Sequence, residues 1–240
     1  MQESFYKDSI VLLDGVIAEV TARLDVIRKY KIIHNDRDPI EYITSRVKSE
    51  ESMKEKLHRK NLDVTLENAL TKIYDAAGIR IICAYIDDVY EVANMLKKYK
   101  DLKLIKEKDY IKNPKPNGYR SYHLVFEVPL DIAGEIHPVY VEIQIRTIAM
   151  DFWSSLEHQM KYKKDIKNQD LIVEELKRCA DDIATNDINM QTIRNMINTG
   201  DWKIITMSKF SSFSTRFAWG GNDIKNERKN FGRWWWKRFS

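Results

Sequence analysis

Two carboxylates stand out in this sequence because each lies beside or within an apolar run that could form a strand. Asp75 precedes "GIRIICAYI", and Glu142 alternates with valine and isoleucine in "PVYVEIQIRT". Successive side chains of a strand point to opposite faces, so Glu142, Gln144 and Arg146 would share one face. A solvated polar face is the simpler interpretation, but two carboxylates facing a cleft could hold Mg²⁺ together with substrate phosphates.

A cationic stretch, "SRVKSEESMKEKLHRK" at 45–60, could bind a polyphosphate. Arg46 and Lys48 would share one face of a strand. Polar groups spaced three or four residues apart would then lie on one side of the following helix: Ser52, Lys56, Arg59 and Lys60. Such a run is usually only a solvated helix face. The sequence contains no GxxxxGK[ST] loop, so any phosphates here would be held by side chains.

An aromatic stretch, "NGYRSYH" at 117–123, follows the loop "KNPKPNG" and could bind a flat ring. By alternation, Tyr119, Ser121 and His123 would lie on the open face of a strand, and Tyr122 would lie in the core. An exposed tyrosine beside hydrogen-bonding groups suits stacking on a nucleobase.

Two further charged residues lie close to these motifs. Arg80 is part of an apolar strand, where a charged side chain normally needs a partner, and an ion pair with Asp75 or a neighbour would serve. Asp151 begins the helix that follows the Glu142 strand. It could accept hydrogen bonds from a guanine edge, or it could only stabilise the helix N-terminus.

The elements that must position these residues predict an α+β fold, a mixed β-sheet of about five strands flanked by helices. Strands are expected at 41–49, 78–86, 102–111, 121–130 and 138–147, the last two joined by a turn at 131–137. Helices are expected at 5–30, 50–60, 65–73, 87–100 and 148–163, with a long helix or a helical hairpin at 169–198. The predicted N-cap of the third helix is Thr65. The predicted buried stripe of the fifth helix is Phe152, Trp153, Leu156 and Met160.

Composition limits the class of protein. An apolar content of 43% supports a folded core. No apolar run reaches the roughly 20 residues that span a bilayer, and the N-terminus has no signal-peptide pattern. Cys83 and Cys179 form no metal-binding motif and are expected to be buried thiols in a reducing cytoplasm.

The last 40 residues differ from the rest of the chain. Residues 201–240 contain nine basic and three acidic side chains and five tryptophans, whereas residues 1–200 contain 31 basic and 33 acidic side chains. The prediction is therefore a domain at 1–200 and a basic tail at 201–240. The tail could bind RNA or lie at a membrane interface, but an extension with no role is the interpretation we favour.

Taken in order, four motifs resemble the synthetase domain of RelA/SpoT enzymes: "RVKSEESMKEKLHRK", "DAAGIRIIC", "NGYRSYHLV" and "VEIQIRTIAMDFWSSLEHQMKYK". The resemblance extends from about Leu12 to Met196. No histidine is followed by aspartate, the dipeptide of the hydrolase domain in long family members. The chain therefore resembles a stand-alone small alarmone synthetase.

The resemblance implies a nucleotidyltransferase-like fold and a reaction. Pyrophosphate would pass from ATP to the ribose 3′-OH of GTP or GDP, giving AMP and (p)ppGpp, the alarmone of the stringent response. Asp75 and Glu142 match the catalytic carboxylates that bind Mg²⁺, and Glu142 would activate the 3′-OH. The terminal helices would assemble a homotetramer.

The resemblance also implies which residues bind the two nucleotides. The positions that match ATP contacts are Arg46, Lys48, Ser52, Lys56, Arg59 and Arg80, with Arg46 and Arg80 enclosing the adenine. The positions that match the GTP or GDP site are Lys115, Asn117, Tyr119, His123, Gln144 and Asp151, with Tyr119 stacked on the guanine.

Two other classes stay open. Another nucleotidyltransferase, such as an oligoadenylate or nucleotide-adding enzyme, usually presents two aspartates after a Gly-Ser turn, and no such turn occurs here. A non-catalytic module that binds RNA or nucleotide would not require Asp75 and Glu142 together.

Overall fold

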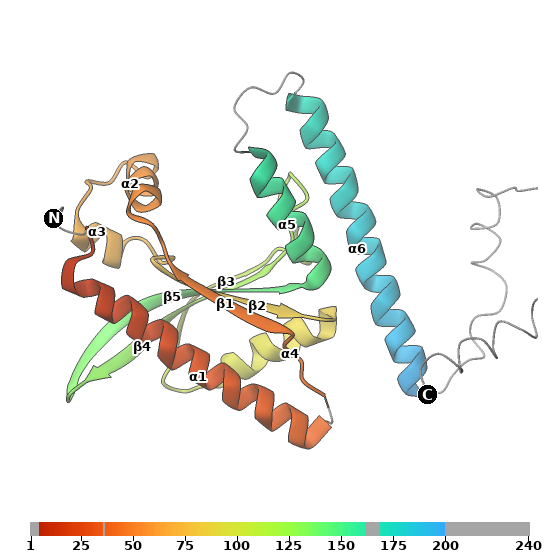
Figure 1. The fold of residues 1–240 in the computed structure, drawn as a ribbon, viewed down its shortest axis with the longest axis horizontal. Helices are drawn as coiled ribbons and strands as arrows, with labels where there is room; N and C mark the ends of the chain where they lie inside the picture. Colours follow the sequence, from red (N-terminus) through yellow and green to blue (C-terminus); the bar gives the residue numbers. More distant parts are fainter. Residues whose placement is uncertain (1–4, 36, 162–168, 200–240) are drawn as a thin grey trace, which may run out of the picture. The chain divides into compact units, whose positions relative to one another are not determined.

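The computed structural model describes residues 5–35, 37–161 and 169–199 (Figure 1). Its strands are β1 (Tyr42–Val47), β2 (Ala77–Cys83), β3 (Lys103–Asp109), β4 (Tyr122–Ile132) and β5 (Glu135–Thr147). Its helices are α1 (Ile10–Asn35), α2 (Glu50–Arg59), α3 (Leu66–Thr71), α4 (Ile86–Leu96), α5 (Ile148–Lys161) and α6 (Gln169–Thr199), and a short 3-10 turn, η1 (Lys7–Ser9), precedes α1.

The five strands form one mixed sheet in the order β1-β2-β5-β4-β3. β2 and β5 are parallel, and the other neighbouring pairs are antiparallel. The predicted α+β class and five-stranded mixed sheet are therefore confirmed. A parallel pair needs a crossover connection, and here the chain between β2 and β5 supplies α4, β3 and β4.

The connection between β4 and β5 is shorter than the predicted turn at 131–137. Ile132 pairs with Glu135, so only Ala133 and Gly134 connect the two strands. Both connecting residues have positive φ, 54° and 93°, as a two-residue hairpin turn of the primed type requires. Alanine rarely adopts that conformation, so the sequence did not indicate that the turn has only two residues.

α1 and α4 cover one face of the sheet (Figure 1). α1 buries a helical stripe that includes Leu13, Val20 and Leu24. These side chains pack with the apolar face of β5, including Ile143, in one core cluster. Burial of such side chains contributes roughly 1.5–3 kcal/mol each. The opposite face of the sheet is left for polar residues.

Two short helices stand beside β1 and begin at hydroxyl caps. Ser52 donates its backbone N–H to Ser49 Oγ at the start of α2, and Asn68 donates to Thr65 Oγ1 at 3.2 Å at the start of α3. The predicted Thr65 cap is confirmed. Met53 and Leu57 are buried and fix the rotation of α2.

α5 does not bury the predicted stripe. Trp153 is buried, but Phe152 is 59% exposed, and Leu156 and Met160 are also exposed. The helix packs against the end of the sheet and against α6, where Trp153 Nε1 donates to Leu176 O at 2.8 Å. The contact with α6 decides which side of α5 is buried. Periodicity within α5 could not predict that contact.

α6 is a single long helix, so the helical hairpin is excluded. Cys83 is buried, and burial raises the pKa of its thiol. Cys179, on α6, is exposed, so the prediction of two buried thiols was wrong for this residue. None of the described helices has the length and apolarity needed to cross a bilayer. The predicted tail at 201–240 lies outside the described residues.

Candidate active site

The register of the sheet creates a first row of side chains on the face opposite α1 and α4. Arg46 pairs with Gly78, and Gly78 pairs with Glu142. Glu142 then pairs with Val125 on β4. Because Gly78 has no side chain, no side chain of β2 lies between Arg46 and Glu142 in this row.

A second row lies two residues further along each strand. Arg80 on β2 pairs with Gln144 on β5, and Gln144 pairs with His123 on β4. His123 pairs in turn with Lys108 on β3. Period-two alternation alone put these side chains on the same face within each strand, but the register puts them side by side.

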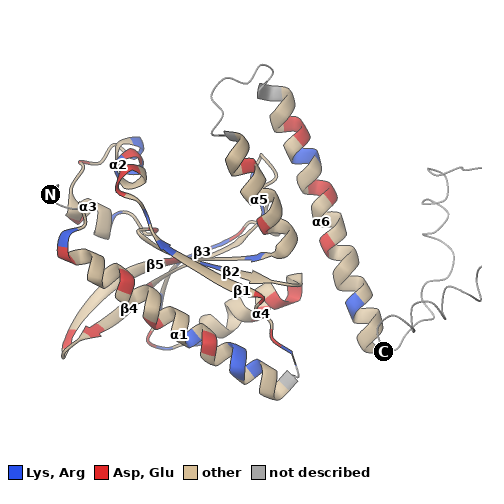
Figure 2. Cartoon of the chain, in the orientation of Figure 1, with Lys and Arg blue, Asp and Glu red and all other residues tan. Residues whose placement is uncertain are grey.

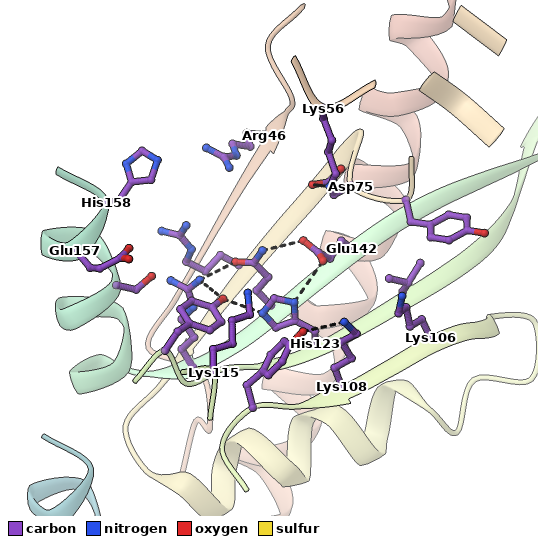
Figure 3. Close-up of a pocket in the computed structure, with 18 of the residues that line it drawn as sticks. Arg46, Lys56, Asp75, Lys106, Lys108, Lys115, His123, Glu142, Glu157 and His158 are labelled. Atoms are coloured by element: carbon purple, nitrogen blue, oxygen red, sulfur yellow. Dashed lines mark hydrogen bonds and ion pairs between the residues drawn. The ribbon is translucent and has the colours of Figure 1, made fainter. Parts of the chain in front are cut away.

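The two rows form the floor of a cavity of about 710 Å³ (Figure 3). A second cavity of about 220 Å³ adjoins it on the β1 and β2 side. Some residues line both cavities: Arg46, Asp75, Arg80, Glu142 and Gln144. Both predicted carboxylates therefore lie at the junction of two compartments, each large enough for part of a nucleotide.

Asp75 is held by two lysines. Its Oδ2 is 2.5 Å from Lys56 Nζ and 3.2 Å from Lys48 Nζ, and Figure 3 shows Lys56 pointing at it. Its other oxygen, Oδ1, is buried without a hydrogen-bond partner. An orphaned carboxylate oxygen is costly, so this atom is available to an incoming cation or donor. The predicted ion pair of Arg80 is formed with the neighbouring Asp151, at 3.3 Å, and not with Asp75.

Glu142 is ionised at neutral pH. Burial raises its pKa, but the hydrogen bond and the charge of His123, followed by the hydrogen bond from Gln144 and the charge of Lys56, outweigh burial and lower the pKa to about 2. His123 Nδ1 lies 3.3 Å from Glu142 Oε1, and Gln144 Nε2 donates to Glu142 Oε2 at 2.8 Å. The charged form is therefore the resting form of this carboxylate.

Five side chains close a ring of hydrogen bonds around the cavity floor. From Glu142 the ring runs through Gln144 to Arg146, whose Nη2 donates to Gln144 Oε1 at 2.9 Å. The same nitrogen donates to the Tyr119 hydroxyl at 2.7 Å, which lies 2.8 Å from His123 Nε2. Tyr119, the predicted platform, is thus connected to Glu142, the predicted base, through Arg146 and Gln144 on one side and through His123 on the other.

Tyr119 is not part of the strand. β4 begins at Tyr122, and Ser121 is fully buried, donating its hydroxyl to Ile145 O, so the predicted open-face position of Ser121 was wrong. Lys115 Nζ lies 4.5 Å from the centre of the Tyr119 ring. Asn117 accepts the Tyr119 N–H at 3.3 Å, which folds the loop back toward the cavity.

Asp151 does not line either cavity. Its Oδ1 accepts Arg146 Nη1 at 3.0 Å and lies 3.3 Å from Arg80 Nη1, and its Oδ2 accepts the hydroxyl of Tyr42 at 3.2 Å. It is only 9% exposed. Burial, with the nearby charge of Arg146, lowers the pKa of Arg80. In this arrangement Asp151 has its carboxylate turned to protein partners.

The structure brings most of the predicted site together. Of the predicted residues, the ones outside both cavities are Ser52, Arg59 and Asp151. Ser52 lies at the N-terminus of α2, and Arg59 is exposed at the C-terminal end of that helix.

Several cavity residues were not predicted as site residues. They include Lys106, Lys108, Tyr110, Arg146 and Glu157. Figure 3 shows Lys106, Lys108 and Lys115 across the cavity from Arg46. Alternation within the predicted strand 102–111 already put Lys106 and Lys108 on one face, but the sequence did not indicate which face meets the cavity.

The carboxylates fit a metal that is shared with substrate. Among the described residues there is no group of three or more acidic, histidine or cysteine side chains that could hold a metal ion. Asp75 and Glu142 could therefore supply two ligands at most, which matches a hexacoordinate cation that takes its other ligands from phosphates and water. The unpartnered Asp75 Oδ1 is the observation that favours this use.

Comparisons with known proteins agree with the site. A family model described as "Region found in RelA / SpoT proteins" matches residues 45–167. The chain is 44% identical over 179 residues to the GTP pyrophosphokinase YwaC of Bacillus subtilis, covering 73% of this chain and 84% of that protein. It is 36% identical over 198 residues to the GTP pyrophosphokinase YjbM of the same organism, covering 82% and 92%.

Solved structures give the same result. The small alarmone synthetase 2 of Bacillus subtilis matches with a TM-score of 0.70 and 41% identity, over 78% of this chain and 97% of that chain. The small alarmone synthetase 1 of that organism, bound to its product pppGpp, matches with a TM-score of 0.71 and 36% identity, over 79% and 97%.

Proposed function

The chain belongs to the RelA/SpoT family, and from this premise we propose that it is a (p)ppGpp synthetase. It transfers pyrophosphate from ATP to the 3′-OH of GTP or GDP and releases AMP. The observation that carries the proposal is the position of Asp75 and Glu142 at the junction of two adjoining cavities. A transfer enzyme must hold donor and acceptor on either side of its charge-neutralising groups.

The donor, ATP, occupies the side of β1 and β2. Arg46 and Arg80 lie on neighbouring rows there and both line the two cavities, which suits the two faces of an adenine ring. The buried Arg80 Nε has no hydrogen-bond partner. The phosphates are held by the cations of the following segment: Lys48, Lys56 and Arg59, with Ser52 at the helix N-terminus.

The acceptor, GTP or GDP, occupies the side of β4 and α5. Tyr119 is the platform for the guanine, and Lys115 is near enough to its ring to interact with the acceptor phosphates. Asn117, His123 and Gln144 surround that platform and supply donors and acceptors. Asp151 completes this group because it matches a guanine-edge contact of the family, and Arg146 connects it to Tyr119.

Mg²⁺ is the proposed cofactor, held by Asp75 and Glu142. When bound, it neutralises the developing charge on the transferred phosphates. Without it, Lys48 and Lys56 compensate the charge of Asp75.

Glu142 is the proposed proton acceptor. The 3′-oxygen forms a bond to the β-phosphorus, the bond from that phosphorus to the α–β bridging oxygen breaks, and AMP leaves with that oxygen. The proton of the 3′-OH passes to Glu142. A carboxylate whose pKa is about 2 is a weak base, so the proton leaves as the new bond forms and not before.

The proposal extends to assembly and location. Exposed apolar side chains lie along both long helices, on α1 at Val11, Val26 and Ile33, and on α6 at Leu171 and Ile188. These support a homotetramer built through the terminal helices. Figure 2 shows acidic and basic residues interspersed along α1 and α6. We propose a cytoplasmic location, because ATP and GTP or GDP are cytoplasmic nucleotides.

One assay tests the function. The purified chain is incubated with Mg²⁺, GTP and ATP labelled in the γ-phosphate or in the α-phosphate, and the nucleotides are resolved. We expect the γ-label in a guanosine 3′-pyrophosphate and the α-label in AMP. Transfer of the α-label to an acceptor would instead indicate an adenylyltransferase, and no product would indicate a non-catalytic module.

A further inference from the structure

Arg146 is a buried cation beneath the proposed acceptor site. It is 3% exposed, and each of its three nitrogens donates a hydrogen bond. Nε donates to Ser121 Oγ at 3.4 Å, Nη1 to Asp151, and Nη2 to both Tyr119 and Gln144. A planar fork of donors can make these contacts in one geometry, whereas a lysine ammonium cannot.

The charge of Arg146 is balanced by the carboxylate of Asp151. A buried guanidinium without a counter-ion would be strongly destabilising, and Asp151 supplies the carboxylate at 3.0 Å. The same carboxylate also approaches Arg80 and accepts the hydroxyl of Tyr42. Oδ1 is therefore engaged by Arg146 and Arg80, whereas Oδ2 accepts only the Tyr42 hydroxyl and keeps a free lone pair.

Tyr119 depends on side-chain contacts for its orientation. Its backbone precedes β4 and is held by the loop, where Lys115 N–H donates to Tyr119 O at 3.1 Å and Tyr119 N–H donates to Asn117 Oδ1 at 3.3 Å, but these bonds do not set the plane of the ring. Arg146 reaches it twice, by the hydrogen bond to its hydroxyl and by the approach of the guanidinium carbon to 5.1 Å from the ring centre. A stacking surface binds best when its plane is set before the base arrives, because the ordering cost is then already met.

We propose that Arg146, with Asp151 as its buried counter-ion, is a positioning residue that fixes Tyr119 for the guanine nucleotide. This inference rests on the proposed function. Asp151 then also acts on the acceptor through Arg146, in addition to the predicted guanine-edge contact. In the proposed ATP site only Arg80 contacts Asp151, so we expect a smaller effect on KM for ATP than on KM for GTP.

The test combines two substitutions that retain shape or charge. Arg146→Lys keeps the cation for Asp151 but loses the fork, and Tyr119→Phe keeps the ring but loses the hydroxyl. Each should raise KM for GTP about tenfold while KM for ATP changes less than about twofold, as expected for loss of one hydrogen bond to a charged group. The double variant should be little worse than either single variant, because both remove the same contact.

The matched control is Arg37→Lys. Arg37 also forms an ion pair with a buried carboxylate, Asp88, but it lies outside the two cavities. It reports the general effect of replacing a guanidinium, and both kinetic constants should stay within about twofold of the wild type. Thermal unfolding of every variant establishes that it is folded.

The outcomes separate this inference from the function itself. A wild-type chain that forms no 3′-pyrophosphate overturns the proposed function. An active wild type with equal rises in KM for ATP and GTP, or with effects that multiply in the double variant, overturns the positioning role alone. Should Arg146→Lys not fold, calorimetric titration of Tyr119→Phe with GTP decides, because unchanged GTP affinity would exclude a role for the contact.

Discussion

Glu142 is the single side chain on which transfer, but not donor binding, should depend. Replacing it by glutamine keeps the shape and one of the two acceptor oxygens that face His123 and Gln144, and it removes the charge that accepts the proton. We expect Glu142→Gln to lower kcat at least about a hundredfold with KM for ATP nearly unchanged. Steady-state kinetics of AMP release measures both constants.

Glu127→Gln is the control for that substitution. Glu127 lies on β4, forms an ion pair with Lys103, and lines neither cavity. Its loss should leave both constants unchanged. Normal turnover by Glu142→Gln would exclude the proposed role of Glu142.

Local sequence patterns predicted the residue types of the site well, but they did not predict which residues contact one another. The cationic stretch, the two carboxylates and Tyr119 were found because strand and helix periodicity sorts side chains by face. The partners of Asp75 and Asp151 come from elements distant in the chain, 19 residues away for Lys56 and 109 for Tyr42. Spacing within one element contains no information on such pairs.

At the scale of elements, α6 holds the acceptor loop. Arg120 donates to Ala180 O at 3.1 Å and to Asp181 Oδ1 at 3.0 Å. Gly118 has φ +89°, and a Cβ added there would lie 2.6 Å from Ala180 Cβ. The loop that contains Asn117 and Tyr119 can therefore approach the helix only because this residue is glycine.

Gly118→Ala should displace that loop from α6. The added methyl group both strains the backbone, by roughly 1–2 kcal/mol, and collides with the helix. We expect a rise in KM for GTP with a smaller change for ATP, measured by initial rates at saturating concentrations of the other nucleotide.

Gly134→Ala provides the matched comparison. Gly134 has a similar φ of +93°, but nothing lies within 4 Å of an added Cβ. It should lower the melting temperature through backbone strain and leave both KM values unchanged. If the two alanine variants have the same KM for GTP, the contact between loop and helix does not position the acceptor.

At the scale of the whole molecule, all residues that line the two cavities lie within the compact unit Met1–Arg194. A chain that ends at residue 200 should therefore retain (p)ppGpp synthesis within about twofold. Light scattering should give the same assembly for the truncated and full chains, a mass near four times that of one chain.

The same truncation tests the tail. Unchanged activity, assembly and RNA affinity would leave residues 201–240 without a role in any of them. A loss of RNA affinity alone would support an RNA-binding tail, in which tryptophans stack on bases and cations contact phosphates. A loss of synthesis would contradict the expectation that the first 200 residues suffice.

The sequence by itself determined the α+β class, the five strands and most of the residue types that line the two cavities, because periodicity and local composition act over a few residues. Tertiary structure alone decided what each polar group contacts. The register brings Arg46, Glu142 and His123 onto one floor, and packing of α5 against α6 turns Phe152 outward and Trp153 inward. The burial of Arg146 against Asp151 likewise depends on which helices and strands are in contact, and the packing of the whole core determines those contacts.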